Sequence, residues 1–226
     1  MEDPTADSTP PEISTTPKKI TLQHWNEDQL CVVDVETTGL IPGFNEVIQL
    51  CILPLDANLE PREDVQPFYL NIIPEMPSRW NKQAAGTTGL SLTMLELTGV
   101  RREAAIELFY QWFDMLKLPL TRGGFRKKIL PLGHNYPFDR AFLHAFFGQL
   151  LYEEYFSGLY RDTMAVANYL NDRAAMHGET VPFAKQSLSW VAQILKIEHG
   201  HAHDALADSI ITAQIYKKMT LEGLLG

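Results

Sequence analysis

The chain has very few cysteines: two in 226 residues, Cys31 and Cys51. Both lie inside short apolar segments, which favours buried free thiols over a disulfide. No Cys-x-x-Cys pair is present, so the usual sequence pattern of a structural zinc site is missing. This scarcity excludes a small fold held together by disulfides or zinc, and stability must come from a hydrophobic core.

Long hydrophobic runs are also missing from the sequence. No apolar segment approaches the roughly 20 residues that a membrane-spanning helix needs. The first four residues, Met-Glu-Asp-Pro, are acidic and polar and do not form the apolar core of a signal peptide. We therefore expect an intracellular, soluble protein of the cytoplasm that has no membrane partner.

Basic residues are fewer than acidic residues in this chain. The chain has 19 Lys and Arg against 28 Asp and Glu, a formal net charge of −9, so no overall field attracts nucleic acid. A nucleic-acid partner has to be held locally, through metal ions or a basic patch. The one compact basic cluster consists of Arg122, Arg126, Lys127 and Lys128. Two interpretations of this cluster stay open, because it either steers a strand toward a site or forms a solvated loop.

The pattern along the chain predicts one α/β domain behind a polar tail. Residues 1–18 are rich in Pro, Ser, Thr and acids, which predicts a disordered tail. Residues 19–226 have the length of a single domain. Apolar β-branched runs predict strands, and apolar residues at helical spacing predict helices. The expected strands are 30–35, 47–53, 65–72 and 129–132, and the expected helices are 103–116, 139–150, 163–170, 187–195 and 205–219. Strands followed by alternating helices and strands indicate layered α/β architecture.

Two carboxylates end the first expected strand. Asp34 and Glu36 are two residues apart, and because side chains alternate along a strand, both lie on one face. Carboxylates side by side repel each other unless cations lie between them. The following residues, Thr37-Thr38-Gly39, add hydroxyl groups and a permissive backbone. Taken alone, the pattern also fits a strand that ends in solvent.

Two further acids fall in informative places. Asp139 closes the segment His-Asn-Tyr-Pro-Phe-Asp, where it also fits an acid that stabilises the N-terminus of a helix. Asp208 falls on the apolar face of the last expected helix, among alanine and isoleucine side chains. A carboxylate there needs a partner, either a buried Lys or Arg or a cation, because an unpaired buried charge is costly.

A histidine precedes the last helix. On a helix, His203 and Asp208 would be about 140° apart, so they converge only if His203 lies on the preceding loop, with Asp204 as cap or first-turn acid. An imidazole in that place suits general-base chemistry at neutral pH. The spacing His201-x-His203 also occurs in zinc hydrolases. Ala205 stands where such a pattern needs an acid, which disfavours zinc.

Together these segments resemble the DnaQ-like exonucleases of the DEDDh type. Asp34 and Glu36 match the first motif of that family, and Asp139 in His-Asn-x-x-x-Asp matches the second. His203 and Asp208 match the third. The resemblance spans essentially the whole domain. It implies an RNase H-like fold, in which a five-stranded mixed sheet with an antiparallel second strand is flanked by helices.

The resemblance also implies a reaction. Members hydrolyse phosphodiester bonds stepwise from 3′ to 5′ and release nucleoside 5′-monophosphates, using two Mg²⁺ ions for which Mn²⁺ can substitute. By this pattern Asp34 lies between both ions and Asp139 supports one of them. Glu36 and Asp208 hold the other, catalytic ion. His203 takes the proton from the attacking water.

The same pattern implies a pocket for the terminal nucleotide. Its residues are Thr38, Gly39, Leu40, His134 and Asn135. One segment departs from the family: where many relatives have a His-Gly-Ile-Thr-like turn, this chain reads Thr-Gly-Leu-Ser at 88–91. The substrate contacts that relatives make through this turn are therefore not assigned to residues of this chain. The catalytic residues of the family pattern are all present.

We therefore expect a single-domain, metal-dependent 3′-5′ exonuclease for single-stranded ends, acting on DNA in preference to RNA, in DNA repair or proofreading. A polymerase or another replication protein is a candidate partner. Two alternatives stay open. One is an exoribonuclease of the same architecture, since that choice rests on contacts to the 2′-hydroxyl. The other is a binding module that has lost activity, against which the complete acid set argues.

Overall fold

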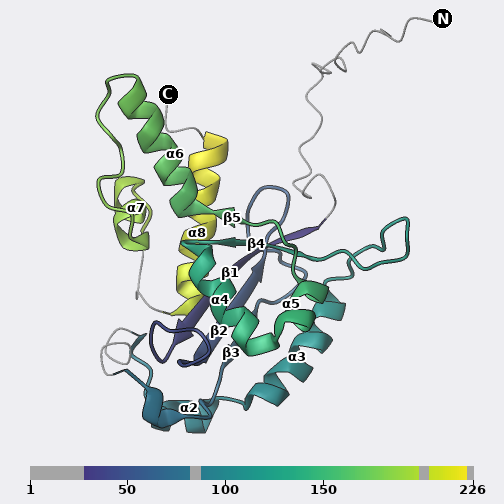
Figure 1. Ribbon diagram of the computed structural model, residues 1–226. Coiled ribbons are helices and arrows are strands. Elements are labelled where there is room, and N and C mark those ends of the chain that lie inside the picture. Colours follow the sequence, from purple (N-terminus) through teal and green to yellow (C-terminus); the bar gives the residue numbers. More distant parts are fainter. Residues whose placement is uncertain (1–27, 82–87, 199–203, 223–226) are drawn as a thin grey trace, which may run out of the picture.

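A five-stranded mixed sheet forms the centre of the computed structural model, which describes residues 28–81, 88–198 and 204–222 (Figure 1). The strands are β1 (Gln29–Thr37), β2 (Val47–Pro54), β3 (Phe68–Asn71), β4 (Ile129–Gly133) and β5 (Arg161–Asp162). Their order across the sheet is β3-β2-β1-β4-β5. β2 is antiparallel to both of its neighbours, and β4 is parallel to both of its own. The expected α/β fold of RNase H-like type is confirmed.

Helices pack on both faces of this sheet (Figure 1). In chain order they are η1 (Pro77–Arg79), α2 (Leu92–Thr98), α3 (Arg102–Met115), α4 (Tyr136–Phe147), α5 (Gln149–Tyr155), α6 (Thr163–Met176), α7 (Leu188–Ile194), α8 (Ala205–Lys217) and η2 (Lys218–Glu222). Four of them begin at a side-chain cap, in which an Asp or Ser oxygen accepts a first-turn N–H: Ser91, Asp162, Ser187 and Asp204. Among the helices that the structure describes, none combines the length and apolarity needed to cross a membrane.

The alternating side chains of β1 separate two hydrophobic layers. Cys31 and Val33 pack with α3, α4 and α5 on one face of the sheet. Val32 packs with α8 on the other face. Since successive side chains point to opposite faces, Asp34 and Glu36 continue the row that faces α8. Both cysteines of the chain are buried and free, as predicted.

Several expected boundaries differ from the observed ones. The helix expected over 139–150 is two helices: α4 begins already at Tyr136, and Gly148, with φ 79°, ends it before α5 starts. A positive φ is easy for glycine and costly for other residues, so the break falls there. The strand expected over 65–72 shrinks to β3, which starts after Pro67, a residue without an N–H to donate. α6 continues to Met176. α2 and the two-residue β5 were not expected.

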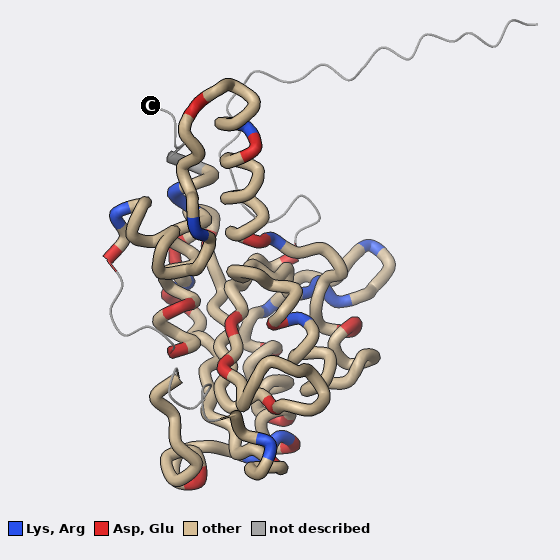
Figure 2. Tube along the Cα trace, turned by 60° about the vertical axis from the view of Figure 1, so that its left-hand side comes forward, with Lys and Arg blue, Asp and Glu red and all other residues tan. Residues whose placement is uncertain are grey.

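The basic cluster, Arg122 to Lys128, lies on a loop between α3 and β4 that projects from the sheet (Figure 1). Lys and Arg segments mark this loop in Figure 2. Because β4 pairs with the beginning of β1, the cluster lies at the opposite end of β1 from the strand acids. Arg126 forms an ion pair with Asp114, and the Lys128 ammonium donates to a backbone carbonyl. These internal contacts favour the interpretation as a solvated loop. The tail expected over residues 1–18 lies outside the described residues.

Candidate active site

Three carboxylates meet at one end of β1. Asp34, Glu36 and Asp208 each offer an oxygen, and these oxygens lie within 4.8 Å of one another. The first two come from the side of β1 that faces α8, and the third comes from the first turn of α8 itself. α8 packs against both β1 and β2. The structure thus brings together three of the four predicted acids from opposite ends of the chain.

Asp139 approaches the same place from the other layer. It lies in the first turn of α4, is 4% exposed, and accepts a hydrogen bond at 3.1 Å from the backbone N–H of Val35. That N–H is available because the pairing of β1 with β4 runs only as far as Val32 and Leu132. Val35 separates the two strand acids in sequence. Asp139 therefore lies beside the three-carboxylate group without being one of its members.

One further carboxylate fixes the start of α4. Asp162 accepts hydrogen bonds from the backbone N–H groups of Asn135 at 3.0 Å, Tyr136 at 3.1 Å and Met164 at 2.8 Å. The same side chain therefore caps α6 and anchors the turn that leads into α4, where Asn135 has a left-handed φ of 64°. Through this turn Asp162 helps to aim Asp139 at β1. It is a positioning residue for the site.

The start of α8 is held by a buried side chain of β2 and a half-buried side chain of β3. Gln49 is 2% exposed, and its carbonyl oxygen accepts the backbone N–H of Ala205 at 2.8 Å. Its amide nitrogen donates to the hydroxyl of Tyr69 at 3.0 Å, and that hydroxyl donates to Asp204. Asp204 in turn caps α8 by accepting two first-turn N–H groups. This chain of bonds fixes the first turn of α8, and with it Asp208, against the sheet.

Sequence reasoning missed Gln49 and Tyr69. The one local signal for Gln49 is a polar residue in the middle of the apolar run Val47 to Leu53, where an amide must find buried partners. Those partners come from β3 and α8, which are distant in sequence. Nothing in the spacing of residues identifies them in advance.

Burial and mutual repulsion raise the pKa of the site carboxyl groups. The pKa of Asp34 is held well above its usual value, first by burial and then by the charges of Asp139 and Glu36. Burial and repulsion from Asp208 and Asp204 raise the pKa of Glu36 to about 7. Burial also raises the pKa of Asp139, against the opposing effect of backbone N–H donors. Such crowded oxygens are the ligands that hard divalent cations prefer.

The predicted residues Thr38, Gly39 and Leu40 form the loop that follows β1. Thr38 is fully buried, and its hydroxyl accepts the backbone N–H of Glu46 at 2.9 Å, so it shapes this loop. A side chain on Gly39 would collide with Asn45, whose atoms lie 2.6 Å from the position of a Cβ. Leu40 is 75% exposed, an accessible position for contact with a base.

The predicted pair His134 and Asn135 has structural contacts. Nδ1 of His134 pairs with the hydroxyl of Thr163 at 2.8 Å, and Nε2 pairs with the carbonyl oxygen of Gln186 at 2.7 Å. Both ring nitrogens have protein partners, and burial lowers the pKa of the ring. The imidazole thus links β4 to α6 and to the segment before α7. The side chain of Asn135 is exposed, and its role in substrate binding stays a prediction.

The predicted general base, His203, falls in the segment 199–203, which lies outside the described residues. Its role therefore stays a prediction. Asp204, the next residue, is observed as the N-cap of α8, as its sequence position indicated.

Comparisons with known proteins give one family match and a set of similar solved structures. The family model described as "Exonuclease" (RNase T) matches residues 31–216, a range that includes all four acids and His203. The search of curated proteins found no match. Among solved structures, E. coli exonuclease I in complex with a dT13 oligonucleotide is similar at a TM-score of 0.64 and 18% identity, over 86% of this chain and 41% of that chain.

Two further solved structures are similar to the chain. Cell-death related nuclease 4 has a TM-score of 0.63 at 21% identity, over 87% of this chain and 64% of its own. A 3′-exonuclease described in 3′-end specific recognition of a histone mRNA stem-loop has a TM-score of 0.61 at 17% identity, with the same coverage of 87% and 64%. The chain thus spans less than half the length of exonuclease I and under two thirds of the other two. At these identities the likeness shows the fold.

Proposed function

Because the chain belongs to the exonuclease family, we propose that it hydrolyses phosphodiester bonds stepwise from the 3′ end of a nucleic-acid strand and releases nucleoside 5′-monophosphates. The observation that carries this proposal is the group formed by Asp34, Glu36 and Asp208, with Asp139 beside it. Four carboxylates in one place repel a phosphodiester unless cations lie between them. The proposal therefore includes divalent metal ions.

The carboxylate geometry supports a magnesium site. Two oxygens on one Mg²⁺ are at most about 4.2 Å apart, since each Mg–O distance is about 2.1 Å. The three oxygens that lie within 4.8 Å of one another are close to this range. We infer two Mg²⁺ ions, replaceable by Mn²⁺: Glu36 and Asp208 would hold one, Asp139 the other, and Asp34 would lie between them. When bound, the ions would activate the attacking water and stabilise charge on the leaving oxygen.

The proposed proton acceptor is His203, which directly precedes the cap of α8. An unperturbed imidazole has a pKa of about 6.5, so at neutral pH much of it is free to accept a proton. Leu40 is the proposed contact to the terminal base, with Thr38 and Gly39 shaping the loop beneath it.

Single-stranded DNA is the proposed substrate, and RNA is the alternative. One similar structure is a complex with a DNA oligonucleotide and another concerns an mRNA stem-loop, so both chemistries need testing. The expected polymerase partner finds no support in these comparisons, and we do not include it in the proposal.

The test is digestion of end-labelled DNA and RNA, single- and double-stranded, with Mg²⁺ and with chelator. A 5′ label reveals a ladder of shortened strands if hydrolysis starts at the 3′ end, whereas a 3′ label is released at once as a mononucleotide. Asp34→Ala should lower the rate by orders of magnitude, and Asp172→Ala, an exposed acid on α6, should not. Full activity in excess chelator would overturn the metal mechanism.

A further inference from the structure

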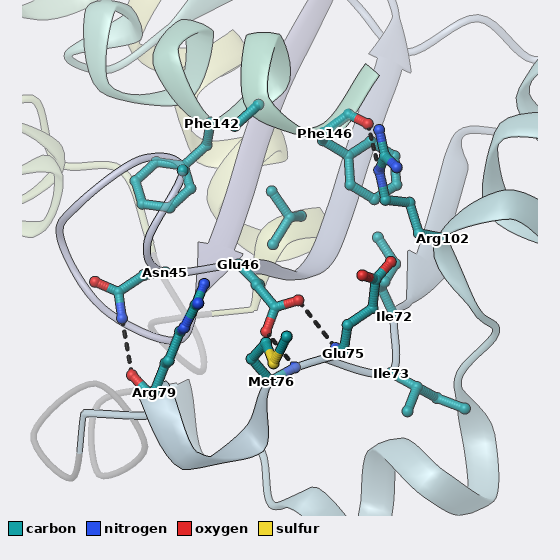
Figure 3. A pocket seen from close by; sticks show the side chains of 13 residues that line it. Asn45, Glu46, Ile72, Ile73, Glu75, Met76, Arg79, Arg102, Phe142 and Phe146 are labelled. Carbon is teal, nitrogen blue, oxygen red and sulfur yellow. Dashed lines mark hydrogen bonds between the residues drawn. The ribbon is translucent and has the colours of Figure 1, made fainter. Parts of the chain in front are cut away.

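A cavity of about 260 Å³ opens between the chain at 43–47, the segment 72–79 after β3 and one side of α4 (Figure 3). Its volume is below the roughly 300–1,000 Å³ of pockets for drug-sized molecules, so it admits a single ring system and not a length of strand. None of the proposed metal ligands lines it.

The cavity adjoins the catalytic end of β1. Phe142, which lines it, lies one helical turn beyond Asp139 on α4. Glu46 also lines it, and the backbone of Glu46 exchanges hydrogen bonds with Thr38, at 2.8 Å to its N–H and 2.9 Å to its hydroxyl. The cavity thus begins one helical turn from Asp139 and one pair of hydrogen bonds from Thr38, within reach of a strand whose 3′ end lies at the carboxylates.

The walls of the cavity are fixed by hydrogen bonds. The carboxylate of Glu46 accepts the backbone N–H groups of Glu75 and Met76, each at 2.9 Å (Figure 3). The side chain of Asn45 accepts the N–H of Ile41 at 3.0 Å and donates to the carbonyl oxygen of Arg79 at 2.9 Å. The cavity is thus formed before any ligand binds, which reduces the ordering cost of binding.

Two guanidinium groups stand at the cavity beside aromatic rings. The guanidinium of Arg79 lies over the ring of Phe44 at 5.0 Å from its centre. The guanidinium of Arg102 lies 5.9 Å from the centre of the Phe146 ring and donates to the carbonyl oxygen of that residue at 2.6 Å. Figure 3 shows the two on different sides of the cavity.

Exposed apolar side chains lie on the two segments that border this cavity. Leu40, Ile41 and Phe44 on the loop after β1 are exposed, and so is Met76 on the facing segment. An exposed apolar surface beside an active site marks a place where a ligand binds. Aromatic rings with arginines beside them are the usual platform for bases of a single strand.

The charges at the cavity favour a base over a phosphate as the occupant. Arg79 and Arg102 are balanced by Glu46 and Glu75, so the lining has no net positive charge to attract a phosphate. A neutral base has an apolar face for the rings and a polar edge that pairs with both donors and acceptors. The lining offers both kinds of contact.

We propose that this cavity, together with the Phe44–Arg79 pair, receives one unstacked base of the substrate strand upstream of the scissile bond. The inference rests on the proposed function, because it places the 3′ end of that strand at the carboxylates. It adds a base-binding subsite that selects for a single-stranded region behind the 3′ end, since a base inside a duplex cannot enter it.

The test is a scan with oligodeoxythymidine strands that carry one abasic residue, placed in turn at each position near the 3′ end. Affinity is measured by fluorescence anisotropy in an Asp208→Asn background, and KM is measured for hydrolysis by the protein with Asp208 intact. At one upstream position, loss of the base should weaken binding about 5- to 100-fold, as expected for one base stacked on an aromatic ring. Phe44→Ala and Arg79→Met should abolish this position dependence. Arg101→Met should retain it, because Arg101 is exposed and does not line the cavity.

Two results would overturn the subsite. One is a wild-type scan without any upstream position dependence, and the other is a pattern that Phe44→Ala and Arg79→Met leave unchanged. Thermal melts of both variants serve as the control for folding. Failure of the proposed function has a different signature, because then the unmodified strand is not hydrolysed with Mg²⁺, whereas the anisotropy scan still reports on the cavity.

Discussion

Glu36 and Asp208 face each other from a strand and a helix, and their closeness has a measurable effect on protonation. Burial, followed by the charge of Asp208, raises the pKa of Glu36 to about 7. In the cation-free protein the ionised form of Glu36 is therefore disfavoured, whereas a bound cation reverses the preference. The free energy of unfolding must then depend on pH and on metal.

The metal-free protein should lose stability as the pH rises from about 4.5 to about 7. Across this range the unfolded chain releases the Glu36 proton while the folded protein still holds it, so the free energy of unfolding falls with rising pH. Glu36 alone should contribute about 3 kcal/mol to this loss, and the raised pKa values of Asp34 and Asp139 add to it. Urea unfolding in chelator measures it. Glu36→Gln should make the curve shallower by removing the Glu36 contribution, and Glu179→Gln, at an exposed position, should leave it unchanged. A stability that increases through this window would contradict the assignment.

Asp208→Asn should make the metal-free protein more stable, by about 1–3 kcal/mol. Asparagine keeps the shape of the side chain and removes one of the charges that crowd Glu36. With saturating Mg²⁺ the difference should narrow or reverse, because the unchanged protein gains binding free energy that the variant largely lacks. Thermal melts of both proteins in chelator and in Mg²⁺ test this, with Asp172→Asn as a surface control. A variant that melts below the unchanged protein in chelator would mean that a basic side chain balances Asp208.

His203→Ala should slow the chemical step about 10²- to 10⁴-fold, the usual span for the loss of a general base. Mg²⁺ affinity should stay nearly the same, because the imidazole is proposed as a proton acceptor and not as a ligand. Single-turnover hydrolysis and metal titration followed by thermal melting separate the two effects. Loss of metal binding in this variant would assign the histidine to the metal instead and revive the zinc interpretation.

At the scale of elements, the start of α8 depends on a few polar groups between the sheet and the helix. Gln49 and the Tyr69 hydroxyl connect β2 and β3 to the first turn of α8, so a change in either displaces the helix that carries Asp208. Tyr69→Phe removes the hydroxyl that donates to Asp204, and it should cost about 1.5–3 kcal/mol of stability, the usual range for a hydrogen bond to a charged group. Mg²⁺ affinity should fall as well, because Asp208 is no longer held in place.

Melting curves with and without Mg²⁺ measure both effects of Tyr69→Phe. The matched control is Tyr169→Phe, since the ring of Tyr169 is exposed on α6. If Tyr69→Phe lowers the melting temperature but leaves the shift caused by Mg²⁺ intact, the network supports the fold alone and does not position the site.

Most elements were predictable because their signal is local. The run Leu30 to Val35 indicates a strand by its own composition, and Asp204 indicates a helix start by its own chemistry. The break at Gly148 was missed because glycine also occurs within helices, and only the backbone angle distinguishes the two cases. The acids were found because each sits in a recognisable segment. Gln49 was missed because its partners are set by tertiary packing.

At the scale of the whole molecule, the spatial order of the strands was not predictable from hydrophobic patterns. Periodicity identifies a strand and the faces it presents, but not the strand that lies beside it. The family resemblance implied five strands with an antiparallel second strand, which the structure confirms, whereas the position of β1 between β2 and β4 is known from the structure. β5 comprises two residues, too few for any pattern, yet its Asp162 holds the start of α4. The site thus depends on an element that the sequence alone does not reveal.

The two buried cysteines have a practical consequence for labelling chemistry. Cys31 and Cys51 are both 0% exposed in the centre of the sheet, and burial raises the pKa of the Cys51 thiol to about 12 and that of Cys31 further. Thiols in that state form almost no thiolate at neutral pH, so maleimide dyes should leave the native protein unmodified and react only in denaturant, as mass spectrometry can establish. The two native cysteines therefore do not have to be replaced before a labelling site is introduced. A single cysteine introduced at Leu40 or at Phe125, both exposed, would carry one fluorophore and report separately on the loop beside the carboxylates and on the basic loop.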